Sequence, residues 1–521
     1  MPCAFRLKRP LPFDDLYPGC QFDVPGAEII DFGGKTWCRF HLPLEAKDAQ
    51  GKPKADWDEQ AIKTFNEAIF AFIDRARSQG RPADLTGVVF PGDIVFDRYR
   101  AGTSALPSVI FFRAHFSAKA NFTGAQFGDE AGFHKTQFSG NARFDQTRFS
   151  GDAEFREAQF DGDAGFEKAQ FNGDTFFLKA QFKGNVEFLE AQFKSSAVFS
   201  AAQFSGEAWF EEAQFSSDAN FRKARFGDEA GFWKAQFTES IDFTRAQFSG
   251  GTNFSEAQFS GPAWFEEARF GGYTDFSGAP GAGEGGNGGG ARGLGDQFHL
   301  VSFVGAKFCG PAWFSNRRFL AQTNFSKCVF AIAPEFHNCP LHQDTDFTDA
   351  KFPDRSGEAA PAYCTLKLAM EQVRARDGEA MFHALEMECR RKRQETPISV
   401  KVFSRLYEWA ADYGRSFMRP FYRLLGFCGV FFLIYLAAFT SNPVPWDIPI
   451  PWDIAAGVGR FTVAQVVRPF SAFTLTEGVT VGSESVEVSF GLACLAAIQS
   501  ILSLGLIALF ILALRRRLRM G

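Results

Sequence analysis

The chain has 521 residues with a formal net charge of −5, and its 22% of charged residues is ordinary for a globular protein. Its 66 phenylalanines exclude an intrinsically disordered chain, and its ten cysteines are too sparse and scattered for a disulfide scaffold. The acidic balance gives no general affinity for nucleic acid, and residues 1–14 lack the apolar core of a secretory signal peptide.

Residues 1–82 form an N-terminal segment in which one long helix is predicted. Between residues 56 and 79, apolar side chains recur at helical spacing, and Gly80 ends the pattern. Asp56 and Glu59 are spaced as in a capping box. The apolar face is made of Ile62, Phe65, Ile69, Phe72 and Ala76. We expect this helix to cover the end of the repeat region that follows, in preference to serving as a docking surface for a partner.

A phenylalanine repeat dominates residues 83–355. From Phe122 to Phe276, a Phe recurs at alternating spacings of five and six residues without one slip. A small or β-branched residue stands two positions before each Phe, as in Ala158-Gln159-Phe160. The first ten members of this core ladder are Phe122, Phe127, Phe133, Phe138, Phe144, Phe149, Phe155, Phe160, Phe166 and Phe171.

This repeat predicts a β-solenoid. Residues two apart on an extended segment point to the same side, so each Phe and the small residue before it share one interior. Gly, Asp, Asn and Ser fill the gaps and are typical of corners. Strands this short cannot form ordinary hairpins, but they can wind into coils that hydrogen-bond to one another about 4.8 Å apart.

The repeat resembles the pentapeptide-repeat family, and Ala83-Asp84-Leu85-Thr86-Gly87 fits the family's unit as it stands. The resemblance implies a mainly β fold, a right-handed quadrilateral β-helix with one unit per side. Every second unit here has an extra residue, so we expect about 22 residues per coil and a bulge at a corner.

The ladder is interrupted at residues 277–295, which are rich in glycine. Within them, Gly281-Ala282-Gly283-Glu284-Gly285-Gly286 matches the glycine pattern of a dinucleotide-binding loop. No helix follows that pattern, so we interpret it as a loop extruded from the solenoid.

Residues 356–420 read as a helical linker that leads towards a membrane. Helices are expected at 363–376 and 379–393, joined at Asp377-Gly378, and a further helix around 402–413. These helices would cap the second end of the solenoid.

Residues 421–521 are predicted to form a transmembrane hairpin with spans of about 421–440 and 488–514. Arginines cluster before the first span and after the second, whereas the loop between holds only Arg460 and Arg468. The positive-inside rule therefore places both termini, the basic tail and the solenoid in the cytoplasm. Together with Tyr413-Gly414-Arg415-Ser416, this region resembles that of membrane-anchored bacterial pentapeptide-repeat proteins, which implies a multi-pass protein of the inner membrane.

A two-span hairpin is also the plan of the simplest tetrameric cation channels. Thr480-Val481-Gly482 matches the start of a potassium filter, with residues 470–476 as a pore helix and Gln499 as a pore-lining side chain. Ser483-Glu484 follows in place of the aromatic-Gly pair, so we favour a chance match. A hydrogen bond between paired helices explains Gln499 equally well.

His337, Cys339 and His342 are close enough in sequence to suggest a metal site. In the repeat register, however, Cys339 takes the small inward position and the two histidines follow core residues on different sides, so convergence on one ion is not expected. Cys328 occupies the same inward position one repeat earlier, and both thiols are interpreted as core fillers. No catalytic residue, metal or cofactor is predicted.

We interpret the protein as a non-enzymatic scaffold that presents its solenoid to an unidentified protein partner at the lipid bilayer. The alternative is an oligomeric ion channel or pore-forming effector that the solenoid gates, which requires a homo-oligomer. The family resemblance adds a third reading, gyrase binding by DNA mimicry, because residues 121–276 hold 24 acidic and 14 basic side chains. The membrane tether argues against this reading, and no nucleic-acid partner is expected.

Overall fold

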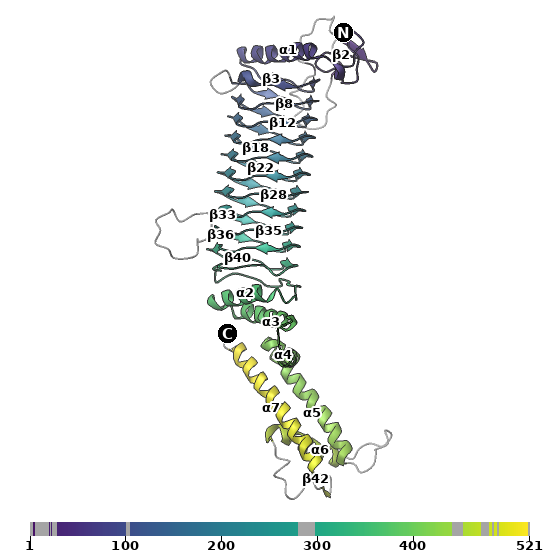
Figure 1. The fold of residues 1–521 in the computed structure, drawn as a ribbon, viewed down its shortest axis with the longest axis vertical. Helices are drawn as coiled ribbons and strands as arrows, with labels where there is room; N and C mark the ends of the chain where they lie inside the picture. Colours follow the sequence, from purple (N-terminus) through teal and green to yellow (C-terminus); the bar gives the residue numbers. More distant parts are fainter. Residues whose placement is uncertain are drawn as a thin grey trace, which may run out of the picture. The chain divides into compact units, whose positions relative to one another are not determined.

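The computed structural model describes residues 4–5, 20, 22, 29–99, 105–279, 297–439, 452–469, 479–481, 484–486 and 489–518. The chain divides into two compact units, Met1–Asp354 and Arg355–Gly521 (Figure 1). The first unit is the solenoid with its N-terminal cap, and the second is helical.

The N-terminal cap combines a small hairpin with one long helix. Strands β1 (Ile29–Phe32) and β2 (Lys35–Cys38) pair antiparallel, and a short 3-10 turn, η3 (Lys54–Asp56), precedes α1 (Glu59–Ser78). The predicted capping box at Asp56 is wrong because Asp56 closes the 3-10 turn. Asp58 caps the helix instead, and its carboxylate accepts a hydrogen bond from the Ala61 amide at 2.9 Å.

Helix α1 lies across the first coil of the solenoid (Figure 1). Phe65 meets Phe90 edge-on at 5.9 Å between ring centroids, and Phe70 meets Phe96 at 5.4 Å. A Cβ added at Gly92 would lie 2.5 Å from the Ile62 side chain, so the helix and the coil approach closely at this point. The buried face differs from the predicted one in containing Phe70 and Ile73.

The solenoid has four faces made of short parallel strands, and in the uninterrupted repeat each strand pairs with the one 22 residues away, as in Phe138 with Phe160 and Ala142 with Ala164. The first face holds β3 (Ala83–Asp84), β6 (Val109–Ile110), β10 (Ala131–Gly132), β14 (Ala153–Glu154), β18 (Thr175–Phe176), β22 (Ala197–Val198), β26 (Ala219–Asn220), β30 (Ile241–Asp242) and β40 (Thr323–Asn324). The second holds β4 (Val89–Phe90), β7 (His115–Phe116), β11 (Gln137–Phe138), β15 (Gln159–Phe160), β19 (Gln181–Phe182), β23 (Gln203–Phe204), β27 (Arg225–Phe226), β31 (Gln247–Phe248), β34 (Arg269–Phe270), β37 (Lys307–Phe308) and β41 (Val329–Phe330).

The third face holds β5 (Ile94–Val95), β8 (Ala120–Asn121), β12 (Ala142–Arg143), β16 (Ala164–Gly165), β20 (Val186–Glu187), β24 (Ala208–Trp209), β28 (Ala230–Gly231), β32 (Thr252–Asn253), β35 (Thr274–Asp275) and β38 (Ala312–Trp313). The fourth holds β9 (Gln126–Phe127), β13 (Arg148–Phe149), β17 (Gln170–Phe171), β21 (Gln192–Phe193), β25 (Gln214–Phe215), β29 (Gln236–Phe237) and β39 (Arg318–Phe319). Two longer strands, β33 (Gln258–Trp264) and β36 (Gln297–Ser302), run from the fourth face onto the first. A short 3-10 turn, η4 (Asp97–Tyr99), follows β5. The predicted four-sided coil of 22 residues is confirmed.

The interior is a stack of phenylalanine rings, and all ten predicted ladder residues are at most 1% exposed. Rings 22 residues apart lie face to face, as Phe144 and Phe166 do at 5.0 Å, and neighbouring columns meet edge-on, as Phe144 and Phe155 do at 5.4 Å. This combination of offset stacks and T-shaped contacts suits the quadrupole of the aromatic ring.

The extra residue of every second unit sits at a corner. Two opposite corners fall within the five-residue spacings and use a left-handed residue, such as Lys179 at a φ of 57° or Lys168 at 55°. The six-residue spacings turn at the other two corners, where coils approach most closely. A Cβ added at Gly173 would lie 2.5 Å from the carbonyl carbon of Gly151, which explains the glycine there.

Several polar side chains in the small inward position bond to backbone carbonyls. Thr136 donates to the Phe111 carbonyl at 2.7 Å and Cys328 to the Phe303 carbonyl at 2.9 Å. Burial raises the pKa of the Cys328 thiol to about 12, so it is an inert core group. Arg317 occupies the same position and is fully buried, a feature that the sequence pattern did not predict.

The described residues of the second unit form helices and one strand pair. Its elements are α2 (Ala360–Gln372), α3 (Arg376–Lys392), α4 (Ile398–Ala411), the 3-10 turn η6 (Asp412–Gly414), α5 (Met418–Phe439), α6 (Trp452–Val467), β42 (Val479–Val481), β43 (Glu484–Val486) and α7 (Phe490–Leu518). The predicted junction at Asp377-Gly378 is wrong, because both residues lie in the first turns of α3 and the chain reverses at Arg374, which has a φ of 60°. Gly378 instead allows close packing, since a Cβ there would lie 2.7 Å from the Met370 sulfur.

Helix α6 between the two apolar helices was not predicted. It packs against both α5 and α7, around a core that includes Phe431, Tyr435, Val458, Phe461 and Ala496. The pore helix predicted at 470–476 lies outside the described residues.

Candidate functional site

A shallow groove follows one corner of the solenoid, between the first and second faces. Left-handed residues project there from successive coils at 22-residue intervals, and the strands of the second face supply the adjoining wall. The lining residues are Arg113, Lys135, Glu157, Gln159, Lys179, Gln181, Ala201, Gln203, Lys223 and Arg225.

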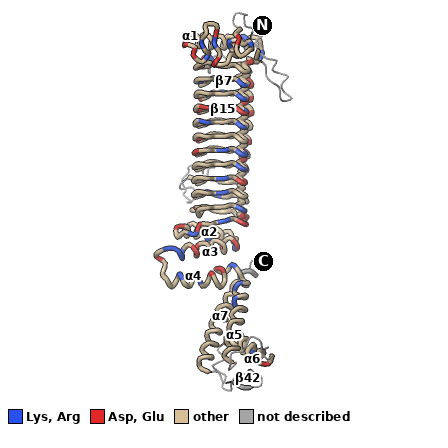
Figure 2. The backbone as a smooth tube through the Cα atoms, turned by 90° about the vertical axis from the view of Figure 1, so that its right-hand side faces the viewer, with Lys and Arg blue, Asp and Glu red and all other residues tan. Residues whose placement is uncertain are grey.

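The groove is basic on a solenoid that is otherwise acidic. Five of its lining residues are Lys or Arg and one is Glu, whereas acidic side chains outnumber basic ones over residues 121–276. Glu157 forms an ion pair with Lys135 at 3.6 Å, which leaves the remaining cations in excess. Figure 2 shows charged residues of both signs along the edges of the coils.

Helices α5, α6 and α7 enclose a buried polar cluster. The Tyr435 hydroxyl donates to Gln499 Oε1 at 2.8 Å, and Gln499 Nε2 donates to the Thr462 carbonyl at 3.0 Å. Ser500 donates to the Gln465 carbonyl at 3.1 Å. In an apolar environment such bonds replace costly unpaired groups, so the cluster ties α6 to both neighbouring helices.

Among the described residues, Gln499 makes the contacts that the helix-pairing interpretation expects. Its side chain is fully buried and bonded to α5 and α6, which is the helix-pairing interpretation. Thr480 and Val481 lie in β42, opposite Ser485 and Glu484 of β43, and Gly482 lies outside the described residues. The structure thus places Thr480 and Val481 in a strand pair and Gln499 in α7.

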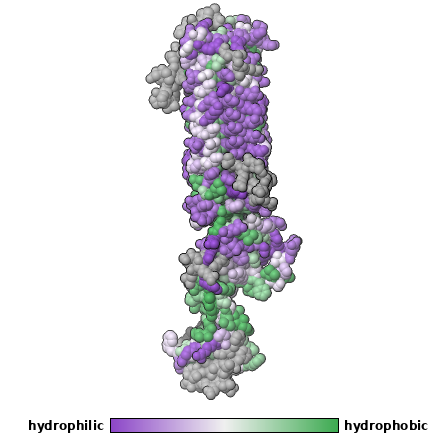
Figure 3. All heavy atoms as spheres, turned by 90° about the vertical axis from the view of Figure 1, so that its left-hand side faces the viewer, coloured by the Kyte–Doolittle hydropathy of each residue, from purple (hydrophilic) through white to green (hydrophobic). Residues whose placement is uncertain are grey.

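Two helices, α5 and residues 490–515 of α7, are long and apolar enough to cross a membrane. Large apolar side chains on them face outward, with Leu433, Ile501 and Leu512 each about 60% exposed. Hydrophobic side chains cover much of the surface of these helices, while the solenoid surface is mostly hydrophilic (Figure 3). Helices of a soluble core would bury these faces, so this exposure favours membrane association.

The sequence-predicted metal candidates do not converge. Cys339 is buried in the solenoid, His337 is exposed, and His342 accepts a hydrogen bond from the Asp344 amide at 3.2 Å. Burial raises the pKa of the Cys339 thiol, which opposes formation of a thiolate ligand.

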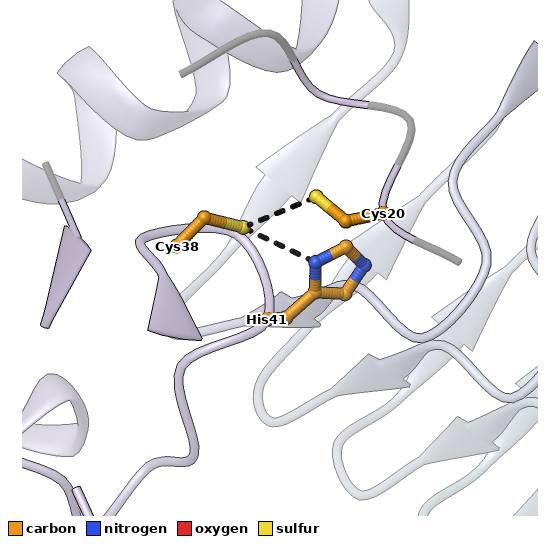
Figure 4. Close-up of side chains that lie close together, drawn as sticks. All are labelled: Cys20, Cys38 and His41. Atoms are coloured by element: carbon orange, nitrogen blue, oxygen red, sulfur yellow. Dashed lines mark hydrogen bonds between the residues drawn. The ribbon is translucent and has the colours of Figure 1, made fainter. Parts of the chain in front are cut away.

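A different trio does converge in the described part of the chain: Cys20, Cys38 and His41, whose ligand atoms all lie within 4.8 Å of one another (Figure 4). This trio was not predicted from the sequence. The Cys-x-x-His spacing of Cys38 and His41 was the available signal.

A family model described as pentapeptide repeats (9 copies) matches residues 111–159, 155–203, 188–236 and 232–280. These overlapping matches cover the central coils of the solenoid. Neither the curated proteins nor the solved structures gave a match. No enzymatic family is indicated.

Proposed function

Because the repeat region of this chain belongs to the pentapeptide-repeat family, we propose that the protein is a non-enzymatic scaffold that holds a partner at a membrane. The observation that carries the proposal is the basic groove, a regular array of cations on a rigid solenoid. The two apolar helices supply the anchor.

The groove suits an extended acidic segment of a protein partner. Lys135, Lys179 and Lys223 are two coils apart in turn, which corresponds to about 9.6 Å at the usual strand spacing. A partner chain in the polyproline II conformation rises about 3.1 Å per residue with three residues per turn, so its carboxylates at every third position would face successive lysines. The glutamine side chains beside them can bond to the partner's backbone. The proposal does not include DNA mimicry, because the groove is positively charged and a DNA mimic presents negative charge.

The anchor places this groove at the cytoplasmic face of a bacterial inner membrane in our proposal. Arg415 lies just before α5, Arg419 and Arg423 lie in its first two turns, and Arg515 lies near the end of α7. This distribution supports cytoplasmic termini by the positive-inside rule.

A charge-reversal experiment tests the scaffold. The full chain in nanodiscs is titrated with a fluorescent oligoglutamate peptide at physiological salt, and we expect Lys135→Glu, Lys179→Glu and Lys223→Glu together to weaken binding at least tenfold. The matched control reverses Arg148, Lys183 and Lys194, which lie outside the groove. Equal weakening by both variants would show a general charge effect and overturn the groove as the docking site.

Helix α6 supports a second candidate, an oligomeric channel. A short apolar helix packed between two spans is the plan of a pore helix, and buried Gln465 and Ser503 side chains add polar groups at membrane depth. Two spans per chain cannot enclose a pore as a monomer or dimer. A tetramer in nanodiscs together with ion flux in liposomes would establish the channel, and a monomer or dimer would exclude it.

A further inference from the structure

Three ligand-type side chains meet where the N-terminal segment reaches the β1–β2 hairpin and the first coil. The sulfur of Cys38 lies 3.7 Å from that of Cys20 and 3.1 Å from Nδ1 of His41 (Figure 4). Cys38 and His41 are buried, and Cys20 is half-buried.

The two distances at Cys38 are close to the edges of a small coordination tetrahedron, and the third, between Cys20 and His41, is below 4.8 Å. With metal–sulfur bonds of about 2.3 Å and metal–nitrogen bonds of about 2.0 Å, tetrahedral angles give edges of about 3.8 Å and 3.5 Å. The sulfur–sulfur separation of 3.7 Å matches, and the sulfur–nitrogen separation of 3.1 Å differs by a few tenths of an ångström. A disulfide would need the two sulfurs about 2.0 Å apart.

The imidazole of His41 is held in the tautomer that a metal needs. Its Nε2 lies 3.0 Å from the carbonyl oxygen of Thr86 in the first coil. A carbonyl can only accept, so Nε2 carries the proton and a neutral ring presents the lone pair of Nδ1 to the thiols. Phe5 stacks on the same ring at 4.0 Å with an interplanar angle of 4°, which fixes its plane.

Lys54 fixes the short loop between the two ligands. Its side chain is fully buried, and Nζ donates to the carbonyls of Arg39 at 2.6 Å and Phe40 at 3.3 Å. The His41 amide also donates to the Cys38 carbonyl at 3.1 Å, which closes a turn. The two side chains are thereby held on one side of the loop, as in metal-binding turns.

We propose that Cys20, Cys38 and His41 bind one Zn²⁺ ion that fastens the N-terminal segment onto the first coil. Two thiolates and a neutral imidazole balance the charge of the ion, water completes the tetrahedron, and the two thiol protons pass to solvent. Phe5 reinforces the attachment, since its ring occupies the space that a side chain at Gly87 would take. Zinc is preferred over harder cations because two of the three donors are sulfur.

Metal uptake tests this proposal. The detergent-solubilised full chain, stripped with a chelator under reducing conditions, is dialysed against Zn²⁺ and its metal content is measured. We expect about one zinc per chain, and at least a tenfold lower content after Cys38→Ser or His41→Gln. Cys309→Ser is the matched control, because Cys309 is an exposed cysteine of the solenoid.

Cobalt and proteolysis readouts cover the case in which a variant fails to fold. The unmodified chain loaded with Co²⁺ should show the visible absorption of a tetrahedral thiolate site. Chelation should expose residues 1–58 to protease, and zinc should restore their protection. Failure of the unmodified chain to take up zinc, equal loss in the Cys309→Ser control, or a Cys20–Cys38 disulfide in place of zinc uptake would overturn the proposal.

Discussion

The two units of the molecule are stabilised in different ways. In the solenoid, every coil repeats the same contacts, and the ring of Phe166 stacks on Phe188 at 4.7 Å much as Phe188 stacks on Phe210 at 4.8 Å. In the helical unit, single contacts such as the hydrogen bond from Tyr435 to Gln499 occur once. A repeated environment leaves a periodic signal in the sequence, whereas a unique contact leaves none.

The repeated packing of the solenoid can be tested at two adjacent residues whose side chains point in opposite directions, and the largest effect is expected here. Phe177 is fully buried between Phe155 and Phe199, at 4.7 and 4.9 Å, whereas Phe176 lies on the outer side of β18. We expect Phe177→Ala to lower the free energy of unfolding by about 3–5 kcal/mol, since it leaves a cavity in a dense core.

The control for that test is Phe176→Ala, which removes the same ring from the half-buried outer position, where Arg156 Cζ lies 4.0 Å from the ring centroid. Phe176→Ala should lower the free energy of unfolding by less than about 1 kcal/mol. Urea unfolding of the detergent-solubilised chain measures both effects, and comparable losses would show that the inward and outward positions are wrongly assigned.

The periodic part of the molecule was predictable from sequence for this reason. The spacing of Phe144, Phe155 and Phe166 predicted which residues face inward and how many residues make a coil. The left-handed corners, such as Lys168, were not predicted, because Gly, Asp, Asn and Ser were expected at corners. The boundary of α1 was missed because Asp56 and Asp58 both suit a helix start, and only the 3-10 turn at Lys54–Asp56 separates them.

The non-periodic features could not be predicted in the same way. Helix α6 contains Gly457 and Gly459, which interrupt a helical pattern, and its stability depends on packing between α5 and α7. The trio of Cys20, Cys38 and His41 is brought together by tertiary structure across the hairpin, so only the Cys38–His41 spacing was visible. Arg317 falls in a position where the repeat requires a small residue.

Arg317 tests what happens when a unique contact is placed inside the repeat. Its guanidinium donates to the carbonyls of Phe276, Ala257 at 2.7 Å and Phe254 at 3.0 Å. We expect Arg317→Ala to lower the free energy of unfolding by about 2–4 kcal/mol, because these carbonyls lose a charged donor and a cavity forms. Urea unfolding provides the measurement, and Arg318→Ala at the exposed neighbouring position is the control.

A negligible loss for Arg317→Ala would mean that water or a shift of the coils replaces the guanidinium. The solenoid would then tolerate irregular positions more readily than its uniform stacking indicates. A loss of unfolding free energy in Arg317→Ala but not in Arg318→Ala would show that one buried side chain stabilises the packing of neighbouring coils next to the glycine-rich segment.

Gln499 provides the corresponding test in the helical unit. Gln499→Leu removes the bonds to Tyr435 and Thr462, and we expect a loss of about 1 kcal/mol in bicelles, typical of hydrogen bonds between helices in lipid. Steric trapping measures the stability. Tyr435→Phe combined with Gln499→Leu should cost less than the sum of the two single changes, because each single change leaves a partner unpaired. Ile501→Leu on the exposed face is the control, and strict additivity would contradict the coupling.

The smallest expected effect concerns the outer surface of the solenoid. On the first face, the outward positions of successive coils form a row that holds Glu154, Phe176 and Val198. Burial raises the pKa of Glu154 to about 7 from its usual 4.5, although Arg156, 3.3 Å away, opposes the shift. The folded state therefore holds this proton more tightly than the unfolded state does. The resulting stabilisation is complete below pH 4.5 and is lost as the pH rises through 7.

Glu154→Gln should remove this dependence. The stability of the unmodified chain relative to Glu154→Gln should fall by about 1 kcal/mol between pH 5 and pH 8, a value reduced for the partial exposure of the carboxyl. Thermal unfolding at the two pH values measures the difference. Val198→Gln, at the same outward position two coils further along the first face, should change stability equally at both. The prediction fails if the unmodified chain instead becomes more stable relative to Glu154→Gln as the pH rises. That result would show that the ion pair with Arg156 outweighs burial in setting the pKa of this carboxyl.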